Sequence, residues 1–378
     1  MTTETVKGFR DFTGEEAVKR AEIRKILVET FEKYGFEPAE TPLVEYEEFV
    51  KGENANDEAV SDVFRLKDKG ERNLALRYEF TFQLKRIMQN KKLPYKRYQI
   101  GEVFRDEPVS ANRFRQITQC DVDIVGSDLR DEAEVLAVVN DVLKSIGVKP
   151  IILINNRKLL DEILKDNDVK DKDRSQVLRE IDKIDKLSEN EVRGNLRKLR
   201  AENVLDSFKK GEECFSKFEN YKDVISLIEY CRIYGIKAQF SPSLARGLSY
   251  YNGSVFEVKA EGIKETIVAG GSYIFNGVQC TGLSFGLERL CLLTNIKDEK
   301  EKFLVVSLEQ DKEAIKLAEK LREKGETASL LYGKPSKALE YANSCNYNKV
   351  IFVGQNEVKE KKFKIKDMKS GKESLLKI

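Results

Sequence analysis

Residues 97–123 contain the run Arg97-Tyr-Gln-Ile-Gly-Glu-Val-Phe-Arg105-Asp-Glu107 and, further on, Arg113-Phe-Arg115-Gln-Ile-Thr-Gln119-Cys-Asp121-Val-Asp123. Residues 95–105 and 114–125 have the composition of strands, and the polar loop from Asp106 to Asn112 joins them. Such a pair predicts an antiparallel hairpin. The loop is too long for a tight turn, so we expect it to have a function.

Side chains on a strand alternate between two faces, so the second strand should present one face that is largely polar or charged. The members of that face would be Arg113, Arg115, Ile117, Gln119, Asp121 and Asp123. Antiparallel sheets often expose a polar face to water, which is the alternative interpretation. However, Arg105 and Arg113 flank the long loop, and guanidinium groups bind phosphate oxygens in pairs. The hairpin therefore favours a site for a nucleoside triphosphate.

Length and charge restrict the class of protein. The 378 residues, 40% of them hydrophobic, exceed what one core usually organises, so we expect at least two domains. Lys and Arg number 67 against 65 Asp and Glu, so any nucleic-acid surface must be local. The sequence has no run of about 18 apolar residues and no signal pattern. These features predict a soluble, cytoplasmic protein without a membrane partner.

The residue types that are missing or scattered restrict the chemistry. The six cysteines are far apart and form no CxxC pair, which argues against zinc and against a disulfide framework. Histidine is absent, which excludes mechanisms based on Ser-His, Cys-His or histidine-metal pairs. Any reaction must therefore rest on Arg, Lys, carboxylates and oriented backbone groups.

A long helix is expected to begin near Glu15. Thr13 and Glu16 have the spacing of a capping box, in which each side chain satisfies a first-turn amide. An apolar stripe follows at Ile23, Leu27, Phe31 and Tyr34. Residues 36–44 then contain two prolines and are typical of a strand or arm at a sheet edge.

The middle of the chain changes character. Residues 151–240 are dominated by charge-rich helical patterns with one obvious strand at 151–154, and we interpret this region as a helical insertion. Strands are expected again at 255–258 and 265–269. Residues 283–293 then fit a strand that passes into a buried helix.

Beyond a charged linker at 297–302, strands and helices alternate to the end of the chain. The expected strands are 303–308, 327–332 and 349–353, and the expected helices are 311–324 and 336–344. This order predicts a small α/β domain with a largely parallel sheet. Its tail, 359–372, is very basic.

Two further clusters carry candidate binding groups. Leu76-Arg77-Tyr-Glu79-Phe-Thr81 could bind an ammonium and a carboxylate, or it could form a surface salt bridge with a helix cap at Thr81. Arg246-Gly-Leu-Ser-Tyr250-Tyr251-Asn-Gly253 combines a cation with glycines and adjacent aromatics. Neighbouring side chains point in different directions, so one tyrosine should line a pocket while the other packs.

The last cluster, Gly282-Leu-Ser-Phe-Gly286-Leu-Glu288-Arg289, joins a strand to a helix whose first turn presents Arg289. Arginine on a helix is usually solvated, so this cluster is weak by itself. Taken in order, however, the four clusters resemble the histidyl-tRNA synthetase family from Lys7-Gly-Phe-Arg-Asp11 to the basic tail. Motif 1 of the class II synthetases resembles the helix and arm ending at Pro42. Motif 2 resembles 104–123, and motif 3 resembles 286–289.

The resemblance implies an α+β fold, with a class II antiparallel-sheet catalytic domain, a helical insertion and a C-terminal α/β anticodon-binding domain. The implied boundaries are 1–150 for the catalytic core, 151–240 for the insertion, 241–296 for the rest of the core, and 302–378 for the anticodon-binding domain. It also implies ATP, histidine and tRNA(His) as substrates, magnesium bridging the phosphates, and a homodimer built across motif 1. The metal ligands are not indicated.

The resemblance also implies roles for individual residues. Glu79, Thr81 and Gln119 would hold the histidine amino group, and Asp123 and Tyr251 would contact its imidazole with Tyr250 beside them. Arg105 and Arg246 would be catalytic, binding the α-phosphate and the carboxylate. Contacts to ATP would also come from Glu107, Arg113 and Arg289. The attacking carboxylate is already ionised at neutral pH, so a protein without histidine can run this reaction by positioning and charge stabilisation.

Three positions depart from the family pattern. Ile117 stands where an adenine-stacking aromatic is usual, Ser249 where aspartate is common, and Ser272 where Gly-Gly normally continues with arginine. Ile117 would weaken ATP binding. Ser272 and Ile274 would either reshape the rim of the histidine pocket or reflect a difference between lineages. Two alternatives stay open: a catalytically silent paralogue that serves as the histidine-sensing regulatory subunit of ATP phosphoribosyltransferase, and an RNA-binding scaffold that uses the lysines at 359–366.

Overall fold

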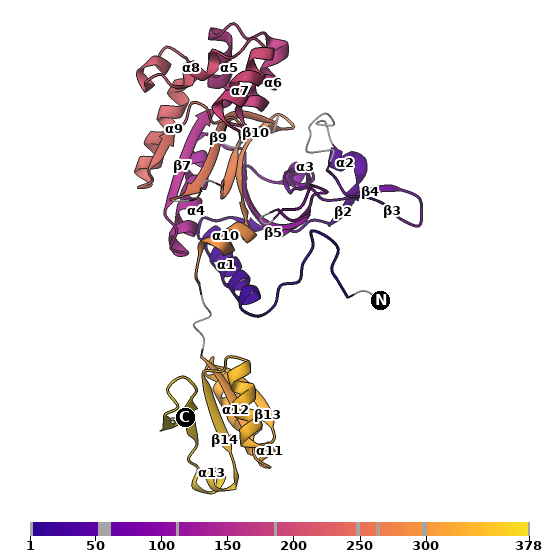
Figure 1. The fold of residues 1–378 in the computed structure, drawn as a ribbon, viewed down its shortest axis with the longest axis vertical. Helices are drawn as coiled ribbons and strands as arrows, with labels where there is room; N and C mark the ends of the chain where they lie inside the picture. Colours follow the sequence, from indigo (N-terminus) through magenta and orange to yellow (C-terminus); the bar gives the residue numbers. More distant parts are fainter. Residues whose placement is uncertain are drawn as a thin grey trace. The chain divides into compact units, whose positions relative to one another are not determined.

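The computed structural model describes residues 3–51, 62–110, 113–184, 187–246, 250–261, 263, 265–296 and 301–376. The chain divides into two compact units, 1–296 and 297–378, which are treated separately below (Figure 1). The predicted boundaries inside the first unit stay predictions. None of the helices in the described ranges is both long and apolar enough to span a membrane.

An eight-stranded sheet forms the centre of the first unit, in the order β1-β5-β6-β11-β10-β9-β7-β8. Its strands are β1 (Glu37–Pro38), β5 (Tyr95–Phe104), β6 (Gln116–Val125), β7 (Pro150–Asn156), β8 (Ala238–Phe240), β9 (Tyr251–Ala260), β10 (Val268–Phe275) and β11 (Val278–Gly286). Only the two outermost pairs, β1 with β5 and β7 with β8, are parallel. The predicted α+β class with an antiparallel catalytic sheet is confirmed.

The predicted hairpin is β5 and β6, paired from Tyr95 with Val125 to Phe104 with Gln116. The prediction that Arg113 and Arg115 lie on the second strand is wrong, because β6 begins at Gln116. At that point the N-terminal segment takes over the hydrogen bonding: the Arg115 N–H donates to the Gly8 carbonyl over 2.9 Å. The two arginines therefore belong to the loop end of the hairpin.

Helices cover one face of the sheet and build the main core. They are α1 (Gly14–Lys33), α4 (Leu129–Ser145), α9 (Tyr221–Ile233) and α10 (Leu287–Leu293). The predicted stripe on α1 is confirmed, since Ile23, Leu27 and Phe31 are fully buried. The predicted capping box is wrong: Thr13 makes no side-chain cap bond, and the Glu16 carboxylate pairs with Arg10 instead.

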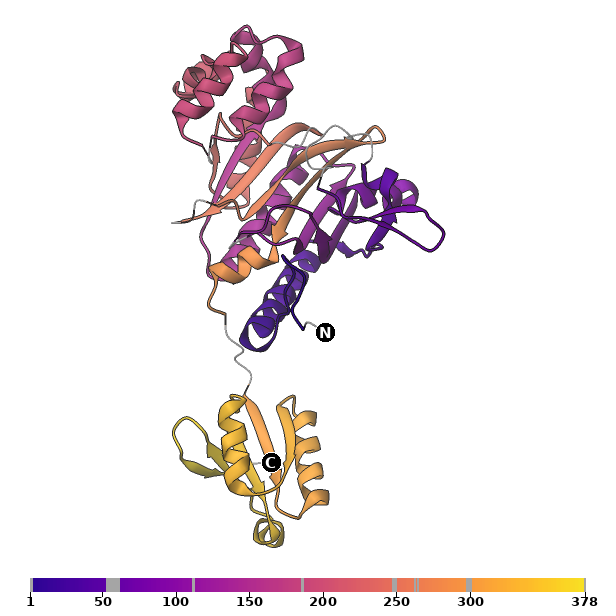
Figure 2. The same cartoon turned by 45° about the vertical axis from the view of Figure 1, so that its right-hand side comes forward.

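Smaller elements flank the sheet. A second, three-stranded sheet of β2 (Val44–Tyr46), β3 (Arg65–Lys67) and β4 (Asn73–Leu76) lies beside α2 (Glu47–Lys51) and α3 (Thr81–Ile87). A helical group follows β7, and both views place it at one end of the large sheet (Figures 1 and 2). Its helices are α5 (Arg157–Asp166), α6 (Asp171–Ile181), α7 (Glu189–Lys198) and α8 (Val204–Phe208). The strands at both ends of the 151–240 region belong to the large sheet.

The second unit is a five-stranded sheet in the order β13-β12-β14-β15-β16. Its strands are β12 (Lys302–Ser307), β13 (Thr327–Tyr332), β14 (Lys349–Val353), β15 (Lys364–Asp367) and β16 (Glu373–Leu375), and its helices are α11 (Asp311–Glu323), α12 (Pro335–Ser344) and α13 (Gln355–Glu360). The first three strands are parallel, as predicted. The basic tail forms the antiparallel edge pair β15 and β16.

Candidate active site

The face of the large sheet opposite the helices is polar, and we call it the site face. Three rows of side chains define it: Arg97 and Gln99 on β5; Gln119, Asp121 and Asp123 on β6; and Gly282, Ser284 and Gly286 on β11. The residues from β5 and β6 are charged or amide-bearing, whereas those from β11 are small. A Cβ atom on Gly282 would lie only 2.0 Å from the Asp123 Oδ1 atom, so a glycine at this position leaves room for the neighbouring carboxylate.

Asp123 is held by two residues that the sequence did not identify as part of the site. The Arg97 guanidinium is fully buried and lies 2.8 Å from the Asp123 Oδ2 atom. The Tyr273 hydroxyl donates to the other carboxylate oxygen. Arg97 could have been found from its alternation with Gln99 on β5, whereas Tyr273 had no such signal. Burial nevertheless raises the pKa of Asp123.

The segment 77–81 brings Glu79 and Thr81 to this face from outside the sheet. The alternative of an exposed salt bridge is wrong, because Arg77, Glu79 and Thr81 are all buried. Arg77 instead donates to the carbonyls of Thr41 and Glu102, each at 2.7 Å. Burial, reinforced by the nearby Asp121, raises the pKa of Glu79 to about 8. The Glu79 Oε1 atom has no hydrogen-bond partner within the described ranges.

Tyr250 and Tyr251 join the same cluster. Tyr250 lies against Glu79 and Thr81, and Tyr251 lies near Arg246 and Asp123. Their ring centroids are 4.7 Å apart, and Tyr250 also packs against apolar core residues, so the prediction that one tyrosine lines a pocket while the other packs stays a prediction. Burial raises the pKa of both hydroxyl groups, so both stay protonated donors.

Arginines gather next to this acidic cluster. Arg105 lies with its guanidinium 4.5 Å from the Tyr78 ring centroid and donates to the Gln119 Oε1 atom over 3.1 Å. Arg246 pairs with Glu257 at 3.4 Å, and Arg113 pairs with Glu107 at 3.2 Å. The buried Nε atoms of Arg105 and Arg246 have no acceptor within the described part of the chain.

Arg289 completes the group from the first turn of α10. Its side chain is exposed and donates to the Thr266 carbonyl, so the alternative of a solvated arginine stays open. Partial desolvation lowers its pKa, as do the neighbouring charges of Arg105, Arg113 and Arg246. The adjacent Glu288 anchors this turn by accepting from the Thr118 N–H and from Arg20 at 2.9 Å. The four guanidinium groups form one positively charged region.

The site therefore has two halves of opposite charge on one sheet face. Glu79, Asp121 and Asp123 are suited to a cationic ligand group, and the arginines are suited to carboxylate and phosphate oxygens. No cluster of three or more Cys, Asp or Glu side chains that could hold a metal ion occurs in the described ranges.

The departures from the family pattern fall in different places. Ile117 pairs with Val103 on β5 and lies half-buried at the start of β6. The expectation that Ser272 reshapes the pocket rim is wrong, because Ser272 pairs with Thr281 on the helix-covered side of the sheet. Its hydroxyl contacts the Ser254 carbonyl there at 3.4 Å. Ser249 lies outside the described residues.

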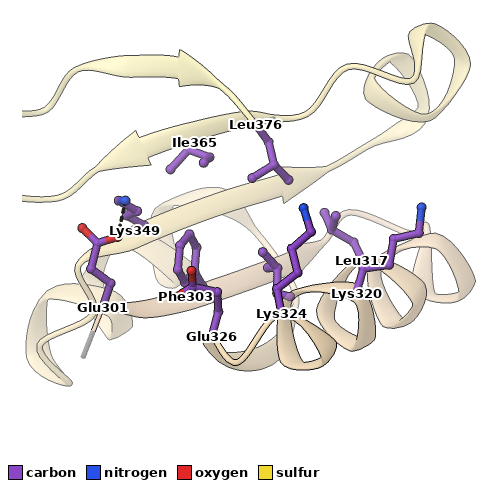
Figure 3. Close-up of a pocket in the computed structure, with 10 residues that line it drawn as sticks. Glu301, Phe303, Leu317, Lys320, Lys324, Glu326, Lys349, Ile365 and Leu376 are labelled. Carbon is purple, nitrogen blue, oxygen red and sulfur yellow. Dashed lines mark hydrogen bonds and ion pairs between the residues drawn. The ribbon is translucent and has the colours of Figure 1, made fainter. Parts of the chain in front are cut away.

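The second unit contains a separate small groove of about 190 Å³ between α11 and the β15–β16 pair. Its floor is apolar, with Phe303, Leu317 and Leu321, and Ile365 and Leu376 cover it from the strand pair. Lys320 and Lys324 extend from α11 along its edge (Figure 3). None of the residues predicted to bind substrate lies in this groove.

Comparison with known families agrees with this geometry. Residues 8–290 match the family model described as histidyl-tRNA synthetase. The chain belongs to the histidyl-tRNA synthetase family. Residues 296–378 match a second model, described as an anticodon binding domain. The synthetase match includes all the residues of the two-halved site.

Proteins named histidine–tRNA ligase resemble this histidyl-tRNA synthetase family member over nearly its whole length. One from Bacillus cereus is 32% identical over 99% of this chain and 95% of its own length. One from Korarchaeum cryptofilum is 33% identical over 93% of this chain and 91% of its own.

Two solved structures show the same fold. The histidyl-tRNA synthetase of Nostoc sp. PCC 7120 has a TM-score of 0.87 and 23% identity, covering 100% of this chain and 97% of its own. A Bacillus halodurans protein described as an ATP phosphoribosyltransferase regulatory subunit/histidyl-tRNA synthetase has a TM-score of 0.79 and 23% identity, covering 93% and 98%.

Proposed function

We propose that this chain is an active class II histidine–tRNA ligase, which converts L-histidine and ATP to histidyl-adenylate and transfers the histidyl group to the 3′ end of tRNA(His). The observation that supports this most is the contact between the two halves of the site. The Gln119 amide touches Arg105 of the basic half and Asp121 of the acidic half. One ligand that carries an ammonium, a carboxylate and a phosphate matches this arrangement.

In this proposal the acidic half binds the amino acid. Glu79, Thr81 and Gln119 receive the ammonium group, because the unpartnered Glu79 oxygen offers it a buried acceptor. Asp123 and Tyr251 contact the imidazole, with Tyr250 beside them. Arg97 and Tyr273 keep Asp123 in place through the contacts described above.

The basic half binds ATP and stabilises the transition state. A histidine carboxylate oxygen attacks the α-phosphorus, the bond from that phosphorus to the bridging oxygen breaks, and pyrophosphate leaves. Arg105 and Arg246 stabilise the charge on the α-phosphate and orient the carboxylate, and their free Nε donors suit this role. Glu107, Arg113 and Arg289 contact the rest of ATP. Mg²⁺ is expected to arrive with ATP, held mainly by phosphate oxygens.

The remaining parts of the proposal concern partners. The second unit, which matches the anticodon binding domain, would contact the anticodon loop of tRNA(His). A homodimer would form across α1 and the strand β1 at the sheet edge, and the protein would act in the cytoplasm. The predicted domain limits of 1–150, 151–240, 241–296 and 302–378 belong to the same proposal.

The decisive experiment is exchange of labelled pyrophosphate into ATP, run separately with each of the amino acids. Histidine alone should support exchange, and Arg246→Ala should abolish it. Arg193→Ala, which removes a half-buried arginine on α7 that pairs with Asp206 away from the site face, is the matched control and should retain activity. Histidine binding without exchange would contradict the proposed ligase and favour a regulatory paralogue. Loss of both, with tRNA binding retained, would favour an RNA-binding scaffold.

A further inference from the structure

Asp121 lies at the centre of the site face, yet none of the roles proposed above includes it. On its strand it stands between Gln99 of β5 and Ser284 of β11, and its side chain is buried. Two neighbours on the site face hydrogen-bond to it: the Gln119 Nε2 atom donates to its Oδ1 atom over 3.3 Å, and the Ser284 hydroxyl also donates to the carboxylate.

The Gln119 side-chain amide lies between a hydrogen-bond donor, Arg105, and a hydrogen-bond acceptor, Asp121. Its Oε1 atom accepts from the Arg105 Nη2 atom at 3.1 Å, and its Nε2 atom donates to Ser284 Oγ at 2.8 Å and to Asp121. A guanidinium has only donors. Burial raises the pKa of Asp121 to about 7, and above that pH its ionised carboxylate has only acceptors. A flipped amide would place its NH₂ group against Arg105 and its oxygen against Asp121. Only one of the two orientations satisfies both neighbours.

The other groups around this amide either depend on Asp121 or are engaged elsewhere. The Ser284 hydroxyl hydrogen-bonds to Asp121, which leaves its oxygen to accept from the Gln119 amide and so reinforces the same orientation. The Arg97 guanidinium is engaged by Asp123 at 2.8 Å and by the Phe80 carbonyl at 3.3 Å. Asp123 is itself held by Arg97 and Tyr273. The acceptor that decides which way the Gln119 amide points is therefore Asp121.

We propose that Asp121 is a positioning residue that fixes the Gln119 amide and, through it, the Arg105 guanidinium for amino-acid activation. This role rests on the proposed ligase function. Asp121 does not touch the reacting atoms in this scheme. Its effect should pass through Gln119, and it should disappear when residue 119 has no amide to orient.

A double-mutant cycle tests that dependence. Asp121→Asn keeps the shape but offers both a donor and an acceptor to Gln119. It should lower the exchange rate roughly 10- to 100-fold, the effect of one buried hydrogen bond to a charged group. In a Gln119→Met background the same substitution should change the rate by less than about twofold, because residues that act as a unit are not additive.

A swapped variant provides the rescue. In Gln119→Glu combined with Asp121→Asn, the new carboxylate can accept from Arg105 and from the new amide, and the total charge is unchanged. We expect its exchange rate within about threefold of wild type, since the charge-assisted hydrogen bond is rebuilt. The matched control is Glu132→Gln, a buried carboxyl on the opposite, helix-covered face, which should leave the rate within about twofold.

The outcomes separate clearly. Equal losses from Asp121→Asn in the wild-type and Gln119→Met backgrounds, or a swapped variant no better than Asp121→Asn, would overturn the positioning role. If Asp121→Asn alone fails to fold, the swapped variant is compared with Gln119→Glu. The positioning role then requires the swapped variant to be more active than Gln119→Glu. If the wild type shows no exchange, the proposed ligase fails. The same cycle measured on histidine affinity by calorimetry then still decides the role of Asp121.

Discussion

The two faces of β6 are both buried, but they differ in what they need to be stable. On the helix-covered face, Cys120, Val122 and Ile124 are packed against α1 and α4 and are satisfied by apolar contact. On the site face, Asp121 and Asp123 are equally inaccessible, and burying a carboxylate is costly unless it is paired. Arg97 forms an ion pair with Asp123 but not with Asp121, so within the described ranges the site face keeps a buried carboxylate without a cationic partner at ion-pair distance, whereas the other face needs no such partner.

The largest expected effect on activity comes from adding a side chain at Gly282 on the site face. In Gly282→Ala, the new Cβ atom would meet the Asp123 carboxylate at 2.0 Å and the Val122 carbonyl at 2.8 Å. Asp123 must then leave Arg97 and Tyr273, and a displacement of about 1 Å in a site can reduce the rate about 100-fold. Pyrophosphate exchange measures this loss. Activity close to that of the wild type would show that the position of Asp123 is not critical.

A smaller effect is expected from Glu79→Gln. Burial raises the pKa of Glu79 to about 8, so this carboxylate becomes ionised as the pH rises from 7 to 9, and the histidine ammonium should bind the ionised form more tightly. Wild-type affinity should rise over this range, and the variant should bind about tenfold more weakly at pH 8 with a flatter pH dependence. Calorimetry at several pH values measures both. Titration of the histidine ligand itself is common to the two proteins and cancels in the comparison.

A substitution on the helix-covered face should lower stability and leave activity unchanged. Ile124→Val removes one buried methylene group from the core between β6 and the helices. It should lower the free energy of unfolding by about 0.5–1.5 kcal/mol and leave pyrophosphate exchange unaltered. Denaturant titration and the exchange assay together test this. A tenfold loss of exchange would contradict the separation of the two faces.

The smallest effect is expected at Glu132, the buried carboxyl of the helix-covered face. Burial raises its pKa in the folded protein to about 7, above the value of about 4.3 in an unfolded chain. A raised pKa of an acid means that the folded state binds the extra proton, so stability falls as the pH rises from about 4.3 to 7. Glu132→Gln should therefore melt about 2–4 °C higher than wild type at pH 8, and the difference should vanish at about pH 4, below both pKa values. An equal difference at both pH values would exclude titration of Glu132 as the cause.

Features set by local periodicity could be predicted from the sequence. Alternation along β6, the apolar stripe of α1 and the alternating strands and helices of the second unit all follow from neighbouring residues. Features that depend on distant partners could not. The Arg115 N–H donates to Gly8, which is distant in the sequence, and the Glu16 carboxylate pairs with Arg10 outside the helix. The hydrogen bond from the Tyr273 hydroxyl to Asp123 joins residues 150 positions apart.

For the site residues too, local composition could be read from the sequence, whereas side-chain orientation could not. Each cluster was found from its own composition, but the sequence could not show that Ser272 faces away from the site. The side on which Ser272 lies follows from its pairing with Thr281, next to Gly271 and Gly282 of the site face. Such pairing joins separate strands, so the composition of one cluster does not specify it.

The two-halved site is assembled from Arg, Asp, Glu, Gln, Thr and Tyr, and the whole chain contains no histidine. Ribosomes therefore translate its message without decoding a single histidine codon. If the chain is the ligase proposed here, a cell starved of histidine can keep producing this protein after its supply of charged tRNA(His) has run out. Recovery would then depend on the return of free histidine and not on histidyl-tRNA left over for making the enzyme.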